Sequence, residues 1–197
     1  MALGRMIRTP RGRLALVVFS LILMTLGVVI WFFYSAPSSP PRKAGGLLEA
    51  FIEGDFAKIW SYAREEELAK LDKEAFKRVY SRIVYSHMKG WELDGPSSLS
   101  WEFGGAYAQA TAWVKCGNGV RFKAQAWFKV KPRRSYTGVM VVFLTMLTQY
   151  VAARDGVDLR VAGKKCREEF REIFHQEGIR EFYDFEDQSW KPLWDTN

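Results

Sequence analysis

An uncharged apolar run near the N-terminus is the feature that most constrains this chain. Residues 14–34 (LALVVFSLILMTLGVVIWFFY) contain no charged residue and no proline. At about 1.5 Å of rise per residue, a helix of that length covers about 30 Å, which is the thickness of the hydrocarbon core of a bilayer. The run predicts a transmembrane helix between a basic N-terminus at 1–13 and a Pro/Ser linker at 35–43, with one domain at 44–197.

The charges that flank this run predict its orientation. Four arginines precede it and only two basic residues follow it closely: Arg5, Arg8, Arg11 and Arg13, against Arg42 and Lys43. Positively charged flanks of a span stay on the cytoplasmic side. We therefore expect a single-pass membrane protein with a cytoplasmic N-terminus and an extracytoplasmic (periplasmic or extracellular) C-terminal domain.

A cleaved signal peptide is the alternative interpretation of the same run. Its hydrophobic region would be unusually long. The only candidate cleavage site with small residues is at Ser35 and Ala36. It has the bulky Tyr34 upstream and Pro37 directly after it. An uncleaved anchor therefore fits the sequence better.

The net charge of +7 does not describe the domain. Six of the 29 basic residues lie in 1–43, which holds no acid, so the remaining 23 stand against 22 acidic residues. Nucleic-acid binding would require a basic stripe on the domain, and the sequence offers only a short run at Lys131, Arg133 and Arg134. We expect no nucleic-acid partner; the lipid bilayer is the first partner the sequence implies.

Cysteine usage leaves two readings open. Cys116 and Cys166 both lie in the part expected outside the cytoplasm, where a disulfide between them would be permitted. The other reading is two separate buried thiols. The absence of a CxxC motif disfavours a redox or zinc site.

The first half of the domain has helical periodicity. Apolar residues from Leu47 predict a helix that Gly54 ends, and Asp55 can cap the next one. Asp72 is a predicted N-cap for a third helix, whose apolar positions continue at three-four spacing through Tyr80 to His87. The acidic run at 65–67 between them is interpreted as a solvated face.

Strands follow from residue 91 onward. The pattern predicts short strands at 91–93 and 99–103 and longer ones at 106–115 and 120–130. Small or apolar residues occupy the even positions of both long strands, so both can keep them on one face only if the loop between them has an odd length. We expect a three-residue loop, Gly117-Asn118-Gly119, with Gly119 left-handed.

A second apolar run, at 138–153, has three interpretations. Its sixteen residues include polar ones and are few for a span, so a buried helix on the sheet is preferred. The alternatives are a membrane-surface helix, with Arg133 and Arg134 on anionic headgroups, and a second span. Residues 163–177 predict a final amphipathic helix that ends at Gly178, and a last strand follows near 182–185.

The order of elements resembles one known superfamily. Three helices precede an antiparallel sheet, and the stretch 47–63 (LLEAFIEGDFAKIWSYA) resembles the first-helix signature of NTF2-like (cystatin-like α+β cone) domains, with Gly54, Asp55 and Trp60 at the matching positions. The resemblance covers about 47–130. It implies an α+β fold, with helices packed on a bent antiparallel sheet and a helical insert at 138–177. Membrane-anchored members include the periplasmic scaffold subunit of type IV secretion systems.

The sequence contains no enzyme motif. HExxH, GxSxG, GxGxxG after a strand and a phosphate-binding glycine loop are all absent, and no cofactor or metal site is expected. His87 is interpreted as a core or pocket-lining residue. A cone pocket could pair it with Tyr80 and with a carboxylate such as Asp94 or Glu102. His175, near a helix C-terminus, suits the helix dipole there.

Tryptophan is abundant in this chain, with eight residues. Four fall on the polar strand face or in the tail: Trp113, Trp127, Trp190 and Trp194. Exposed aromatic patches usually indicate a partner. We expect a non-enzymatic accessory or scaffold subunit that binds another envelope protein or its own copy. The alternative is a small-molecule-binding or isomerase/hydrolase-type protein with a pocket in the cone.

Overall fold

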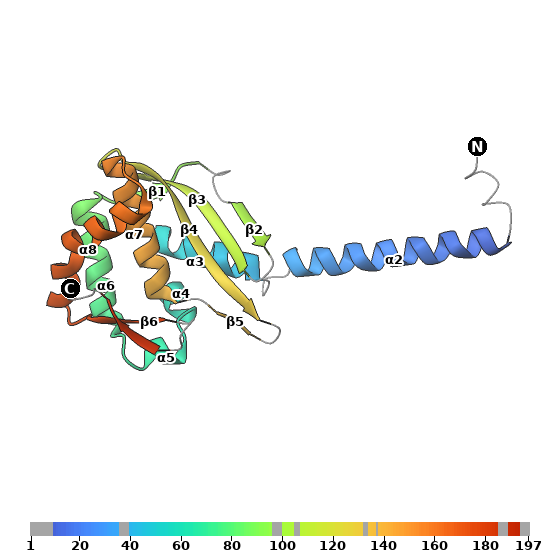
Figure 1. Ribbon diagram of the computed structural model, residues 1–197, viewed down its shortest axis with the longest axis horizontal. Coiled ribbons are helices and arrows are strands. Elements are labelled where there is room, and N and C mark those ends of the chain that lie inside the picture. Colours follow the sequence, from blue (N-terminus) through green and yellow to red (C-terminus); the bar gives the residue numbers. More distant parts are fainter. Residues whose placement is uncertain are drawn as a thin grey trace.

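The computed structural model describes residues 10–35, 40–95, 100–104, 107–131, 134–136, 138–184 and 189–193. Its first helix, α2 (Pro10–Ser35), projects away from the rest of the chain (Figure 1). Within α2, the segment Leu14–Trp31 is entirely exposed, and its length and composition suit a membrane span or a signal sequence. The predicted apolar helix of spanning length is confirmed, and among the described residues no other helix meets this test.

The predicted Pro/Ser linker at 35–43 is helical over part of its length. Helix α3 (Pro40–Glu53) begins inside it, while 36–39 lie outside the described residues. Pro40 and Pro41 are compatible with helix here because the first turn of a helix has no intrahelical acceptors for its N–H groups.

Short helices follow α3, and their ends match the predicted caps. α4 (Phe56–Ser61) begins after Gly54, whose φ is +69°, and Asp55 accepts a hydrogen bond from the Lys58 N–H. α5 (Glu65–Leu68) is a single turn. α6 (Lys73–Ser81) is capped by Asp72, which accepts from the Ala75 N–H at 2.7 Å. The predicted N-caps at Asp55 and Asp72 are confirmed.

The third predicted helix changes its geometry before it ends. Residues Arg82–His87 form a π-helix, η1, which continues α6. A π-helix has more residues per turn than an α-helix, so positions after its start rotate relative to the three-four pattern. Met88 takes the inward position and is fully buried, whereas His87 is exposed.

One antiparallel sheet contains the strands predicted between 91 and 130. Its members are β1 (Trp91–Leu93), β2 (Ser100–Gly104), β3 (Tyr107–Cys116), β4 (Arg121–Lys131) and β5 (Arg134–Tyr136). The order is β1-β3-β4-β5, and β2 also pairs with β3. Together with the helices, this sheet confirms the α+β class.

The β3–β4 hairpin has the predicted register. Val114 pairs with Phe122 and Lys115 pairs with Arg121, so Gly117, Asn118 and Gly119 form the loop, with φ of +91° at Gly119. The described even-numbered positions face the core and are buried: Ala108, Ala110, Ala112, Val114, Phe122, Ala124, Ala126 and Phe128. The predicted three-residue loop is confirmed.

The second apolar run is a buried helix. α7 (Val139–Asp155) packs against β4, and nine of its residues are buried. This favours the interpretation of a core helix over a membrane-surface helix or a second span. The membrane-surface interpretation places Arg133 and Arg134 on anionic headgroups. Arg133 and the side chain of Arg134 lie outside the described part of the chain.

The C-terminal part adds one helix and one hairpin. α8 (Leu159–Gln176) starts four residues earlier than predicted because Asp158 caps it, accepting from the N–H groups of Arg160 and Val161. It ends as predicted, with Gly178 at φ +75°. β6 (Glu181–Asp184) pairs with β7 (Ser189–Pro192) in a separate two-stranded sheet.

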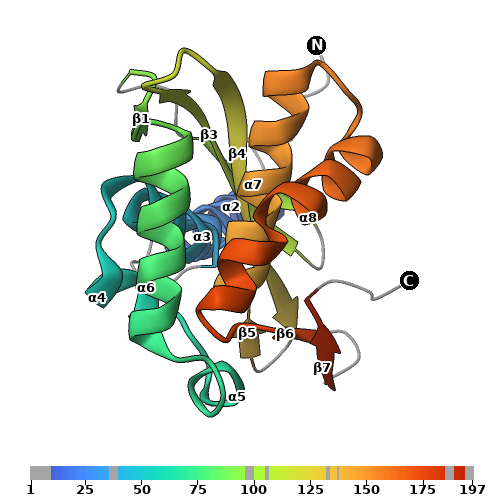
Figure 2. The same cartoon turned by 90° about the vertical axis from the view of Figure 1, so that its left-hand side faces the viewer.

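Aromatic side chains from three helices form the centre of the core. The rings of Phe51 on α3 and Phe143 on α7 stack at 5.8 Å, and Phe76 and Tyr80 on α6 lie 5.5 and 5.6 Å from Phe143. α8 packs on the outer side of α7 (Figure 2). The helices thus cover the inner face of the sheet.

The tip of the β3–β4 hairpin docks on the turn after η1. The Gly117 N–H donates to the Gly90 carbonyl (3.0 Å), the Asn118 N–H to the Met88 carbonyl (3.1 Å), and the Asn118 side chain to the Tyr150 hydroxyl (2.7 Å). A Cβ at Gly117 would lie 2.2 Å from the Lys89 carbonyl oxygen. The close approach requires glycine at this position.

We therefore predict that Gly117→Ala destabilises the domain by about 1–3 kcal/mol, because the new methyl group forces the hairpin tip off the turn. Urea unfolding of the detergent-solubilised chain, followed by tryptophan fluorescence, measures this. Gly163→Ala is the matched control: its Cβ would meet only Thr148 Cγ2, at 3.9 Å, inside α8. The control should be neutral or gain about 0.5–1 kcal/mol. Equal unfolding midpoints for the two variants would contradict the close docking.

Candidate functional site

The outer face of the β3–β4 hairpin presents an exposed tryptophan among cations. Trp113 is 43% exposed, and the guanidinium carbon of Arg121 lies 5.0 Å from the centroid of its ring. Arg121 also forms an ion pair with Asp94. Lys123, directly opposite Trp113 in the register, is exposed. An indole with a stacked guanidinium is a common anchor in protein interfaces.

Strand register and one loop place these groups together. Because Lys115 pairs with Arg121, Trp113 and Arg121 are diagonal neighbours on the same face of the hairpin. Asp94 follows β1, and its N–H donates to the Trp113 carbonyl at 2.8 Å, which brings its carboxylate beside Arg121. The three residues come from two strands and the loop after β1, and they form one surface.

The four tryptophans expected to bind a partner do not form one patch. Trp127 shares the outer strand face with Trp113 but is half-buried, opposite Gln109. Trp190 is on the separate β6–β7 hairpin, and Trp194 lies outside the described residues. Among the four, Trp113 is therefore the candidate for a contact residue on the sheet.

Tyr80 and His87 do not face a common pocket. Tyr80 is fully buried; its hydroxyl donates to the Phe51 carbonyl and accepts from the Trp91 indole N–H at 3.1 Å, and burial raises its pKa. His87 is exposed because of the π-helix, with its ring 5.5 Å from that of Phe170. The expected pocket pair is thus corrected. Of the two carboxylates considered with it, Asp94 pairs with Arg121, and the side chain of Glu102 lies outside the described part.

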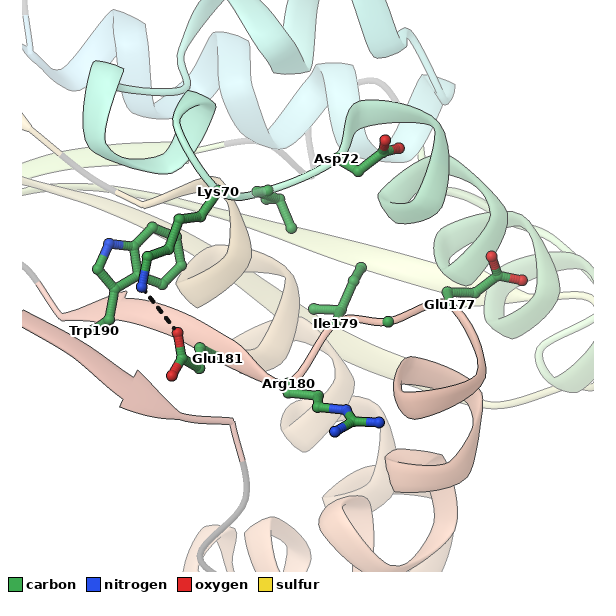
Figure 3. A pocket seen from close by; sticks show the side chains of 9 residues that line it. Lys70, Asp72, Glu177, Ile179, Arg180, Glu181 and Trp190 are labelled. Carbon is green, nitrogen blue, oxygen red and sulfur yellow. Dashed lines mark hydrogen bonds and ion pairs between the residues drawn. The ribbon is translucent and has the colours of Figure 1, made fainter.

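An open groove lies between the start of α6 and the C-terminal hairpin (Figure 3). It has a volume of about 370 Å³. The Lys70 ammonium lies 4.8 Å from the centroid of the Trp190 ring and 3.2 Å from a Glu181 carboxylate oxygen. The Trp190 ring also meets the Tyr183 ring edge to face at 5.6 Å. Trp190 is thus already in contact with a cation and a second ring.

A second open groove, of about 460 Å³, lies between the Lys89–Gly90 turn and the hairpin tip, and Cys116 is one of its lining residues. Cys116 and Cys166 are both free and buried, as the second reading of the cysteines expected. Burial raises the pKa of Cys116 to about 11 and that of Cys166 to about 12. Both thiols are therefore protonated and unreactive near neutral pH.

Sequence reasoning missed one buried carboxyl group. Glu67, in the acidic run interpreted as solvated, is 1% exposed. Its oxygens accept from the N–H groups of Val139 (3.2 Å) and Met140 (3.3 Å) at the start of α7. Gly138, the N-cap of α7, has no side chain for this purpose, so Glu67 caps the helix from 72 residues away. No local pattern predicts such a contact, because it depends on tertiary placement.

Desolvation of the buried Glu67 carboxyl group has a larger effect on its pKa than the N–H groups at the start of α7. Desolvation raises its pKa from 4.5 to about 7, although the two N–H donors of α7 and the charge of Arg64 act in the opposite direction. The folded state thus binds a proton more tightly than the unfolded chain. The contribution of this group to stability is complete below pH 4.5 and is lost as the pH rises through about 7.

From this we predict that the wild-type chain loses about 3 kcal/mol of stability relative to Glu67→Gln between pH 4.5 and 7.5. Gln keeps the shape and an acceptor oxygen but does not titrate. Urea unfolding of both proteins across this range measures the difference. The exposed neighbour supplies the control, Glu65→Gln, which should follow the wild type at every pH. Parallel pH profiles for wild type and Glu67→Gln would show that Glu67 titrates normally.

Comparison with known proteins does not assign this chain to a family. Family models, curated protein sequences and solved structures all give no match. Within the described residues, no group of three or more His, Cys, Asp or Glu side chains is arranged to hold a metal ion.

Proposed function

We propose that this chain is a membrane-anchored, non-enzymatic accessory or scaffold subunit whose domain binds another envelope protein, or a second copy of itself, outside the cytoplasm. The observation that carries the proposal is a pair of exposed apolar features. α2 is apolar and entirely exposed over Leu14–Trp31, and Trp113 is exposed on the outer face of the sheet. A bilayer would cover the first and a partner the second.

The position of the basic residues supports the anchored arrangement. Arg42, on α3, is exposed close to the end of α2. Figure 1 shows the β4–β5 hairpin, which runs through Lys131 and Arg134, on the same side of the domain as α2. In the proposed arrangement this end of the domain lies nearest the lipid headgroups, where basic residues interact favourably with anionic lipids.

We further propose that the domain is an NTF2-like variant. Support comes from the order of elements, with helices α3 to α6 before an antiparallel sheet, and from the Gly54-Asp55 break at the end of α3. The chain differs from the NTF2-like order of elements in α7, α8 and the separate C-terminal hairpin. Function does not follow from such a fold. The proposed role rests on the surfaces.

Small-molecule binding, with or without isomerase or hydrolase activity, is the second candidate. The groove of Figure 3 favours it, because it combines an indole, an ammonium group and carboxylates around a volume of small-ligand size. A pocket between the helices and the sheet has less support, since Phe51, Phe143 and Tyr80 fill that space. A metabolite that co-purifies with the chain would favour this candidate.

The proposed topology predicts where a C-terminal reporter works. Alkaline phosphatase, which needs disulfides, should be active when fused after Asn197, whereas a fluorescent protein that folds only in the cytoplasm should stay dark. The fusion should remain in the carbonate-washed membrane fraction, with the mature chain starting before residue 14. A soluble product that begins after residue 34 would show that the run is a cleaved signal peptide.

Trp113→Ala should weaken partner binding without unfolding the domain. A central tryptophan anchor contributes at least about 2 kcal/mol, so the affinity should fall by tenfold or more. Affinity purification of the detergent-solubilised chain from its native membrane, with mass spectrometry, identifies the partner, and titration then measures the loss. Tyr85→Ala is the matched control, because Tyr85 is an exposed aromatic residue (58%) that lies on η1 and not on the sheet. If Trp113→Ala lowers the melting temperature as much as an alanine substitution of the buried Trp91, Trp113 is a core residue instead.

A further inference from the structure

A line of four cations runs along the exposed side of α8. Its members are Arg160, Lys164, Arg167 and Arg171. The steps of four, three and four residues place them on one face of a helix, within about 17 Å at 1.5 Å per residue. All four residues are exposed. A neighbouring face of α8, with Cys166, Phe170 and Phe174, is buried on α7 and η1.

These cations have no intramolecular partner in the part of the chain that the structure describes. Other basic residues nearby are paired: Arg154 makes two 2.6 Å hydrogen bonds to Glu169, and Lys165 lies 2.8 Å from Asp155. The side chains of Arg160, Lys164, Arg167 and Arg171 make no such bond within the described residues.

The line is unfavourable for the isolated helix in two ways. Like charges three or four residues apart repel one another, and Glu168, four residues from Lys164 and three from Arg171, offsets only part of this repulsion. Arg160 lies in the first turn, where the helix dipole disfavours a cation, and Asp158 uses its carboxylate on main-chain N–H groups. A partner that brings negative charge to this face would relieve both effects.

The flanking charges favour an acidic protein helix over a polyanion. Glu168 and Glu172, both exposed, form a short parallel line about 100° around the helix from the cations. A uniformly charged phosphate polymer would meet these carboxylates as well as the cations. A helix that carries one acidic line can face the cations and direct other side chains toward the glutamates.

The position of α8 also disfavours the membrane that would hold α2. α8 lies on the helical side of the domain, beyond α7, and α2 extends behind the domain when α8 faces the viewer (Figure 2). The outer sheet face with Trp113 lies on the other side of the core. The two surfaces therefore point away from each other and differ in chemistry.

We propose that Arg160, Lys164, Arg167 and Arg171 form a docking line for an acidic amphipathic helix of a partner protein, separate from the Trp113 surface. With two such surfaces the domain bridges two partners, which is the geometry of a scaffold. The docking line does not require Trp113, so each surface can fail its test independently.

The test uses the full-length chain in non-ionic detergent and a labelled helical peptide with glutamates at i, i+4, i+7 and i+11. Fluorescence anisotropy should show binding that weakens as salt is raised. Lys164→Glu with Arg167→Glu should lower the affinity at least tenfold, and a peptide with lysines at the same four positions should bind this variant and not the wild type. Circular dichroism checks that the variant remains folded.

Two matched variants separate this site from general charge effects. Lys73→Glu with Lys77→Glu makes the same charge change on exposed residues of α6 and should keep the affinity. Trp113→Ala should also keep it. Equal binding of a peptide with its glutamates spread around the helix would overturn the proposal. So would tighter binding to duplex DNA or phosphatidylglycerol vesicles, or a Lys164-dependent dimer of the chain itself.

Discussion

The small side chains on the inner face of the β3–β4 hairpin determine how closely the helices can approach. Five alanines (Ala108, Ala110, Ala112, Ala124 and Ala126) occupy the centre of this face and are fully buried. Helices α3 and α7 both pack there, and their approach stacks Phe51 on Phe143. Larger residues on the strands would force the two helices apart and separate these rings. The same close packing lets Phe51, Phe143 and Tyr80 fill the space between the helices and the sheet.

Much of the local structure follows from the sequence because its causes are local. The caps at Asp55 and Asp72, the break at Gly54 and the three-residue hairpin loop each depend on a few neighbouring residues, and each appears as predicted. Residue parity was sufficient to distinguish a three-residue loop from a two-residue turn, because an error of one residue would have exposed Phe122 and Phe128.

The features that the sequence did not predict depend on contacts between distant segments. The π-helix shifts His87 outward so that Met88 can fill the core, a choice that the three-four pattern cannot show. Glu67 belongs to an acidic run that looks solvated, yet α7 covers it. The tryptophans were grouped by composition, whereas the fold places Trp113 on the main sheet and Trp190 on a separate hairpin. In each case tertiary packing determined the outcome.

The Lys70–Glu181 contact bears on the order in which the protein is made. It joins residues 111 positions apart, and the Trp190 ring that completes this part of the surface comes from the last strand. During synthesis, α5 and α6 emerge long before β6 and β7, at about 5–20 residues per second. For several seconds Lys70 and its neighbours therefore lack their contacts with Glu181 and Trp190, and the C-terminal hairpin packs on the α5 end of the domain last. A chain released before β6 emerges would contain the sheet and its helices but would leave this side open to chaperones and proteases.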